Sequence, residues 1–274
     1  MKILIAADME GISGAVNWDQ VTTTHPEYAR FRKIMTGDVN AAIRGSAQSG
    51  ADEIVVTDGY AYGLNILIEE LDSKARLNSG NASPFAMVQG VDGGVDGVLF
   101  VGYHARAGSQ HAILNHTWSS KTIADVELNG RGVGEIGLNA ALCGHFGVPV
   151  LMISGDQTAC GEARDLLGPI EVAVVKRATS KMSAECLPLE VSRRLICEAA
   201  ARAVGRFKAG EAFQPFRMAA PVQVMVEFQQ PEMAEHASLL PGVRQVDGRR
   251  IGFTSPDMPA AYQTFRAVTA LARG

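Results

Sequence analysis

The stretch KILIAAD at residues 2–8 decides the fold, because it is a continuous apolar run that ends in an acid. A strand with one face in water alternates polar and apolar residues, and this run does not. It therefore predicts a strand buried on both faces, as in a parallel sheet with helices packed on either side. Asp8 closes the run and marks the carboxyl end of that strand.

Similar apolar runs recur along the first two thirds of the chain. They fall at residues 51–58 (ADEIVVTD), 95–104 (VDGVLFVGYH), 148–154 (VPVLMIS) and 170–175 (IEVAVV). Between the first two strands, apolar residues recur at helical spacing from Phe31 to Ile43. Strands that alternate with helices predict the α/β fold class, with a mainly parallel sheet and flanking helices.

The pattern changes after residue 176. An apolar helix face runs from Ile196 to Phe207, and the alternating run VQVMVEF at residues 222–228 is typical of a half-exposed antiparallel strand. Residues 249–253 follow an Asp-Gly turn and are expected to pair nearby. Residues 258–271 predict a last amphipathic helix.

This change suggests how the 274 residues are divided. The length suffices for one large domain or two modest ones, each with a hydrophobic core. We expect an α/β domain at residues 1–176 and a smaller C-terminal α+β subdomain at residues 177–274.

Composition narrows the function classes. The chain is 47% hydrophobic and 20% charged, with a net charge of −4, so neither nucleic acid nor a membrane is an expected partner. The four cysteines form no CxxC pair, which favours reduced thiols over disulfides. The first apolar run is too short for a signal peptide, so we expect a cytoplasmic protein. No GxGxxG or Walker-type loop follows a strand, which argues against a nucleotide site.

Polar residues gather at the ends of the expected strands. Asp8 ends the first strand and Glu10 follows it, Asp58 ends the second, and His104 ends the third. Ligands of open parallel sheets bind outside the carboxyl ends of the strands, so these side chains could share one crevice. Carboxylate and imidazole ligands suit zinc, manganese or cobalt. In the alternative interpretation, the acids are helix N-caps and His104 is an interior histidine.

Two further residues have possible functions. Glu135 follows an expected hairpin around Asn129-Gly130, either as an acid at a helix N-terminus or as another carboxylate in the crevice. His116 lies in the loop after the third strand and is the candidate for proton transfer. His111 is near it in the sequence but lacks comparable context, and three further histidines have no acidic or histidine company and are expected to be structural or at the surface: His25, His145 and His236.

These residues stand in motifs that resemble the D-aminopeptidase family of zinc metallopeptidases, whose founding member is a bacterial dipeptide-operon protein. The matching stretches are DMEGISG (8–14), PFAM (84–87), GYHARA (102–107), NH (115–116), VGEIGLNA (133–140), VPVLM (148–152) and GD (155–156). They occur in the family's order, and the resemblance continues more weakly to the end of the chain.

The resemblance implies a function and a site. It implies a dinuclear zinc centre, whose ligands here would be Asp8, Glu10, His104 and Glu135, and His116 as the catalytic histidine. The expected reaction is hydrolysis of short peptides with an N-terminal D-amino acid by a metal-activated water. The family's usual assembly is a ring-shaped homodecamer that encloses its active sites.

One position departs from the family pattern. After the second strand the family has an acid, a small residue and a metal-binding histidine, whereas this chain reads Asp58-Gly59-Tyr60. A phenol with an ordinary pKa of about 10 is a poor ligand at neutral pH. Tyr60 could still bind metal, one metal could be weak or missing, or water or Asp58 could substitute. The alternatives to the peptidase are a metal- or peptide-binding scaffold with weakened or lost catalysis and a hydrolase of a non-peptide amide.

Overall fold

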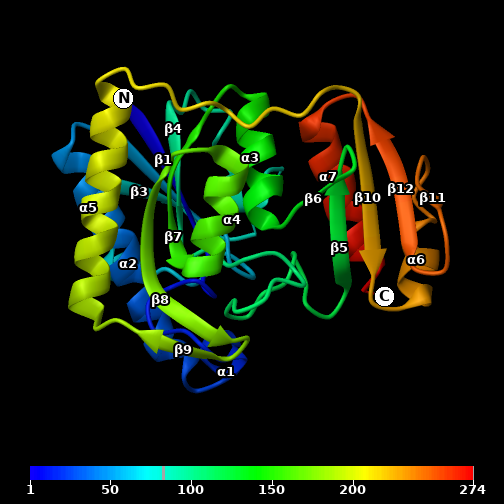
Figure 1. Cartoon of the computed structure of the whole chain (residues 1–274), viewed down its shortest axis with the longest axis horizontal. Helices are drawn as coiled ribbons and strands as arrows, with labels where there is room; N and C mark the ends of the chain where they lie inside the picture. The colour runs from blue at the N-terminus through cyan, green and yellow to red at the C-terminus, as the bar shows by residue number, and fades with distance from the viewer. Residues whose placement is uncertain (82–83, 274) are drawn as a thin grey trace.

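The computed structural model describes residues 1–81 and 84–273 and contains two β-sheets with helices beside and between them (Figure 1). The large sheet has the strand order β3-β2-β1-β4-β7-β8-β9, and only β9 runs antiparallel to its neighbour. Its strands are β1 (Lys2–Ala7), β2 (Glu53–Asp58), β3 (Ala75–Asn78), β4 (Gly97–Val101), β7 (Val150–Asp156), β8 (Glu171–Ser180) and β9 (Ser183–Cys186). The predicted α/β class with a mainly parallel sheet is confirmed.

Strand β1 lies inside the large sheet, as its apolar sequence predicts. It pairs in parallel with β2 on one side and β4 on the other, and residues 3–7 are fully buried. Ala7 stands beside both Asp58 and Val101 in the register. The carboxyl ends of the three strands therefore lie next to one another, which brings the loops that follow them together.

Helices cover both faces of the large sheet. On one face, α2 (Tyr28–Gln48) packs against α5 (Leu189–Lys208), and the pair lies along the left of Figure 1. On the other face lie α3 (Glu135–His145) and α4 (Gln157–Leu167). The short elements near the strand ends are α1 (Trp18–Val21), η1 (Ile68–Glu70) and η2 (Ala86–Val88).

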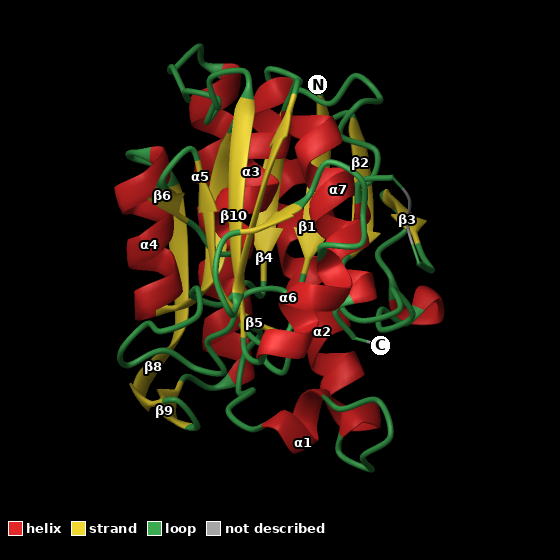
Figure 2. Cartoon of the chain, turned by 90° about the vertical axis from the view of Figure 1, so that its right-hand side faces the viewer, coloured by secondary structure: helices red, strands yellow, loops and turns green. Residues whose placement is uncertain are grey.

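The small sheet has the strand order β11-β12-β10-β5-β6 and is antiparallel. Its strands are β5 (Ile123–Leu128), β6 (Arg131–Gly132), β10 (Val222–Phe228), β11 (Arg244–Gln245) and β12 (Arg250–Ser255). Helix α6 (Pro231–Ala237) packs on it, and α7 (Met258–Leu271) lies between it and α3. Figure 2 shows the small sheet in front of the large one.

The two sheets draw on both parts of the sequence. Strands β5 and β6 precede residue 176 but belong to the small sheet, whereas α5 follows residue 176 and packs beside the large sheet. The division into residues 1–176 and 177–274 stays a prediction. All four cysteines are free thiols. Within residues 1–81 and 84–273, no helix has the length and apolar character needed to cross a membrane.

Candidate metal centre

Two adjacent strands bring the first three predicted ligands together. Asp8 directly follows β1, and Glu10 lies two residues further along the same loop. Strand β4 ends at Val101, earlier than the sequence suggests, so His104 lies on the loop beyond it. Because β1 and β4 are parallel neighbours, the two loops leave the sheet side by side.

The other two predicted residues reach the same place from different elements. His116 lies on the long loop between β4 and β5, and its backbone N–H donates to the carbonyl oxygen of Ala105, beside His104. Glu135 is the first residue of α3, which begins after the β5–β6 hairpin. The backbone N–H of Trp118 donates to Oε1 of Glu135 at 2.7 Å and orients its carboxylate.

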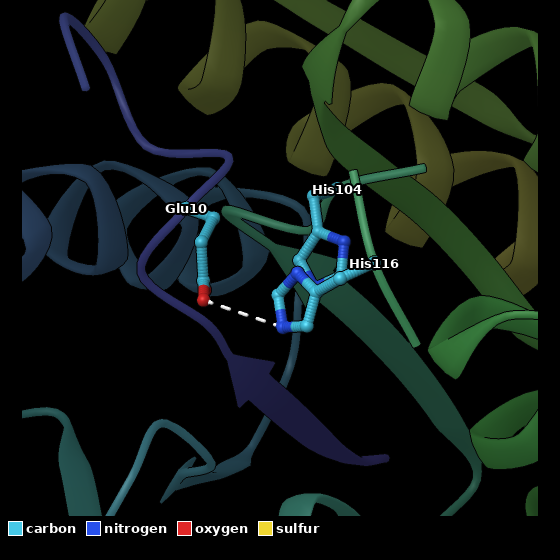
Figure 3. Close-up of side chains that lie close together, drawn as sticks. All are labelled: Glu10, His104 and His116. Atoms are coloured by element: carbon cyan, nitrogen blue, oxygen red, sulfur yellow. Dashed lines mark ion pairs between the residues drawn. The ribbon is translucent and has the colours of Figure 1, made fainter. Parts of the chain in front are cut away.

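The five side chains converge at short distances. His104 Nε2 lies 3.1 Å from Glu135 Oε1 and 3.5 Å from Asp8 Oδ2. His116 Nε2 lies 3.6 Å from Glu10 Oε1 and 3.7 Å from Glu135 Oε1. The two imidazole rings are stacked with centroids 4.0 Å apart, and Figure 3 shows His116 turned toward Glu10. All five residues are buried, and His116 is the most exposed at 8%.

Backbone hydrogen bonds orient both histidines. Nδ1 of His104 lies 3.0 Å from the carbonyl oxygen of Ala105, and Nδ1 of His116 lies 2.8 Å from that of Leu114. A carbonyl oxygen only accepts, so each Nδ1 carries a hydrogen, and each ring, when neutral, presents the lone pair of Nε2. Histidines that bind a metal through Nε2 are commonly held in this way.

The centre contains acceptors that face acceptors. Asp8 Oδ2, Glu10 Oε2 and His104 Nε2 are buried and have no hydrogen-bond partner in the described structure. Buried polar atoms are rarely left unpaired, because the loss of hydration costs about 1–3 kcal/mol for each group. Two sets of atoms lie within metal-binding range, one from Glu10, His104 and His116 and one from Asp8, His104 and Glu135. Their donor atoms fit a bound zinc ion.

The charges of the centre favour a cation. Burial, together with the charges of Glu10 and Glu135, raises the pKa of Asp8 well above its usual range. Burial alone would lower the pKa of His104, but the nearby carboxylates outweigh it and raise that pKa well above the usual value. Burial would raise the pKa of Glu135, yet the charge of His104 and its own hydrogen bonds lower it to about 2. Three buried carboxylates thus compete for positive charge.

The pKa of His116 shifts in the opposite direction. Burial and the charge of His104 lower it, which keeps the imidazole neutral and able to accept a proton. Trp18 packs edge-on against this ring at a centroid distance of 5.4 Å. His116 also lines a cavity of about 550 Å³ above the centre, whereas His104 does not. Of the two histidines, His116 is therefore the one that a molecule in the cavity would meet.

Sequence reasoning missed the residue that holds the Glu10 loop. Lys176, buried on β8, donates from Nζ to the carbonyl oxygens of Glu10 at 2.6 Å, Ile12 at 2.9 Å and Ala15 at 2.6 Å. Burial lowers its pKa to about 8. The only signal in the sequence is a lysine directly after the apolar run IEVAVV. Its ammonium group fixes the backbone that carries a candidate ligand.

Tyr60 and Asp58 have other partners. The hydroxyl group of Tyr60 donates to the carbonyl oxygen of Val21 at 2.6 Å, and burial, with the nearby Glu10 and Asp8, raises the pKa of this phenol. Asp58 accepts hydrogen bonds from the backbone N–H groups of Asn65 and Ile66. Tyr60 is thus a neutral donor that holds the end of α1, and Asp58 organises the loop after β2.

The other histidines lie outside the two candidate ligand sets. His111 is exposed, and its Nδ1 lies 3.0 Å from the carbonyl oxygen of Thr179. His145 and His236 are exposed in the last turns of α3 and α6, and His25 lies 3.8 Å from Asp19 at the surface. For His25, His145 and His236, a structural or surface role stays the prediction.

Carboxylates and imidazoles gathered beside a cavity at the strand ends of an α/β sheet are typical of metal-dependent hydrolases. The D-aminopeptidase family profile matches residues 1–267. A D-aminopeptidase of Bacillus subtilis strain 168 is 37% identical over 274 residues, which cover 99% of this chain and 98% of the relative. The solved structure of a zinc-dependent D-aminopeptidase from Bacillus subtilis, a self-compartmentalizing protease, matches with a TM-score of 0.95 at 35% identity, covering 100% of this chain and 98% of that one. The chain therefore belongs to the D-aminopeptidase family, as its motifs indicate.

The contact between the two ligand loops gives a first prediction. A Cβ atom at Gly11 would lie 1.9 Å from the carbonyl oxygen of Tyr103, so Gly11→Ala should push the Glu10 loop away from the His104 loop. We expect zinc affinity, measured by competition with a chromophoric chelator, to fall by about tenfold or more. The control is Gly161→Ala, because a Cβ there meets nothing within 4 Å. Unchanged zinc affinity in Gly11→Ala would contradict this account of the loops.

Proposed function

We propose that this protein is a zinc-dependent aminopeptidase that hydrolyses short peptides with an N-terminal D-amino acid. The observation that carries the proposal is the set of buried, unpaired acceptors at the strand ends: Asp8 Oδ2, Glu10 Oε2 and His104 Nε2. Metal cations bound among these side chains would satisfy such atoms. Family membership over residues 1–267 supports the reaction, and the zinc dependence of the Bacillus subtilis relative supports the metal.

In this proposal, Asp8, Glu10, His104 and Glu135 hold zinc. The two candidate ligand sets share His104, whose Nε2 has a single lone pair, so that residue can bind only one ion, and a second ion would be held by the remaining side chains. Zinc bound there would polarise a peptide carbonyl and lower the pKa of a bound water to about 7. Glu135, oriented by the Trp118 N–H, is fixed on the rigid first turn of α3.

We assign proton transfer to His116. Its ring lines the cavity, and its Nε2 faces the carboxylates of Glu10 and Glu135. The Leu114 carbonyl fixes the hydrogen on Nδ1, so Nε2 is the atom that takes a proton and later returns it to the leaving amine. Trp18 covers one side of the ring and keeps it from turning away.

The substrate and the assembly follow the relatives. The cavity of about 550 Å³ suits a peptide of a few residues. The preference for a D-residue rests on the family. Because the Bacillus subtilis relative is a self-compartmentalizing protease, we propose that this chain also forms a homo-oligomer. The proposal of a ring decamer rests on the family resemblance, and that of a cytoplasmic location on the sequence. The exposed apolar side chains of Tyr62, Leu64 and Ile68 are candidates for contacts between subunits.

The test is hydrolysis of dipeptides with D- or L-alanine before glycine. Purified protein should cleave the D-Ala dipeptide, lose activity after treatment with a chelator and regain it when zinc is added. The L-Ala dipeptide should be cleaved at least about tenfold more slowly. Cleavage of neither dipeptide by zinc-loaded protein would favour the scaffold, and cleavage of only non-peptide amides would favour the other hydrolase.

Two substitutions separate the proposed roles. His116→Ala should keep the zinc content and reduce turnover by roughly a hundredfold or more, because proton transfer is lost. Glu135→Ala should reduce the zinc content itself, because a ligand is lost. Elemental mass spectrometry and peptide hydrolysis measure the two quantities on the same samples. If His116→Ala lost zinc as Glu135→Ala does, His116 would be a ligand and not the catalytic base.

Tyr60 gives a prediction specific to this chain. Tyr60→Phe removes the donor to the Val21 carbonyl, which should lower the free energy of unfolding by about 1–3 kcal/mol. Zinc content should stay the same, because the neutral phenol is not a ligand. The control is Thr23→Val, which removes a hydroxyl group at an exposed position and should change neither quantity. A loss of zinc in Tyr60→Phe alone would identify Tyr60 as a ligand.

A further inference from the structure

In the cavity above the centre, the acidic and the basic lining residues lie apart from one another. Its acidic lining residues are Asp8, Glu10 and Glu135, all buried at the floor. Its basic lining residues are Lys121, Arg266 and Arg273, all half-buried or exposed. The cavity therefore has a negative floor and a positive rim. A zwitterion, with its amine at one end and its carboxylate at the other, complements that arrangement.

Helix α7 supplies most of the rim. Arg266, Thr269 and Ala270 line the cavity, and their spacing of three and four residues places them on one face of α7, while Arg273 lies just beyond the end of the helix. The ring of Trp118 packs edge-on against Phe265 of the same helix at 5.4 Å. Since Trp118 also orients Glu135 through its backbone N–H, α7 is linked mechanically to the centre.

Arg266 is the best-placed cation of the three. One of its terminal nitrogens donates to the carbonyl oxygen of Pro84 at 2.6 Å, which steadies the side chain where it lines the cavity. It is half-buried, whereas Lys121 and Arg273 are exposed, so its charge is less screened by solvent. A guanidinium held in this way presents a fixed positive charge that attracts a carboxylate.

We propose that Arg266, flanked by Lys121 and Arg273, binds the C-terminal carboxylate of a short peptide whose N-terminus lies at the metal centre. This inference rests on the proposed function and adds a substrate class, namely unblocked peptides short enough to span the cavity. The rim then limits peptide length, because a longer chain would carry its carboxylate past Arg266. It also selects against peptides whose C-terminus is amidated.

The experiment compares D-Ala-Gly with its C-terminal amide. Wild-type protein should show a kcat/KM for the acid about tenfold or more above that for the amide. Arg266→Gln should lower the value for the acid by about tenfold, mainly through KM, and change the value for the amide by less than about twofold. Arg266→Lys should recover part of the loss. The control is Arg194→Gln, at an exposed position of α5 beside Glu198, and this variant should behave as wild type.

Two results would overturn the inference. One is equal kcat/KM for the acid and the amide in the wild type. The other is an equal loss on both peptides in Arg266→Gln, which would mean that Arg266 acts only by supporting the Pro84 segment. Calorimetry of the binding of the acid and the amide to zinc-loaded protein tests the subsite separately from the proposed function. If neither peptide is cleaved, the proposed function fails. Tighter binding of the acid than of the amide would still support the carboxylate subsite, and equal binding of the two would contradict it.

Discussion

The backbone contact between two loops supports the rest of the site. The N–H of Gly11 donates to the carbonyl oxygen of Gly102 at 2.8 Å, and a side chain at either glycine would collide with the opposite loop. This approach is possible because β1 and β4 are parallel neighbours that end at the same level. It sets the separation of Glu10 and His104, and Lys176 then fixes the Glu10 loop from behind. The positions of the ligands are thus a consequence of the sheet.

The buried charges of the candidate centre lower the stability of the fold and favour the binding of a cation. Three carboxylates and two imidazoles are buried together, and several of their acceptor atoms have no donor. Burying such groups without a cation costs free energy, which the packed core of the two sheets must offset. A cation bound among these groups removes that cost, which therefore contributes to the affinity for the metal. A buried cluster of this kind indicates a ligand more strongly than exposed acids do.

The sequence predicted the parts of the molecule that follow from local patterns. The apolar run at residues 2–8, the hairpin turn at Asn129-Gly130 and the helix that begins at Glu135 were all readable, and they place the candidate ligands near one another. The pairing of β5 with β10 could not be predicted from the sequence, because it joins segments about a hundred residues apart. Lys176 and Trp118 were missed for the same reason: their partners are backbone groups and a side chain that only the folded chain brings near. The sequence did not show whether Asp58 joins the other acids in the crevice or organises a loop, because acids at strand ends do either; here it accepts hydrogen bonds from the loop after β2.

Each sheet supplies a different part of the cavity, so the candidate site needs both. The large sheet supplies the floor of the cavity, because its parallel strand ends gather the acids and imidazoles. The small sheet supplies the opposite wall, because it presents α7 over that floor. The long loop from β4 to β5 crosses from one to the other and carries both His116 and Trp118. A shift of either sheet would therefore move the His116 imidazole relative to the candidate metal ligands and the rim relative to the floor, so the geometry of the candidate centre and its cavity depends on the interface between the sheets.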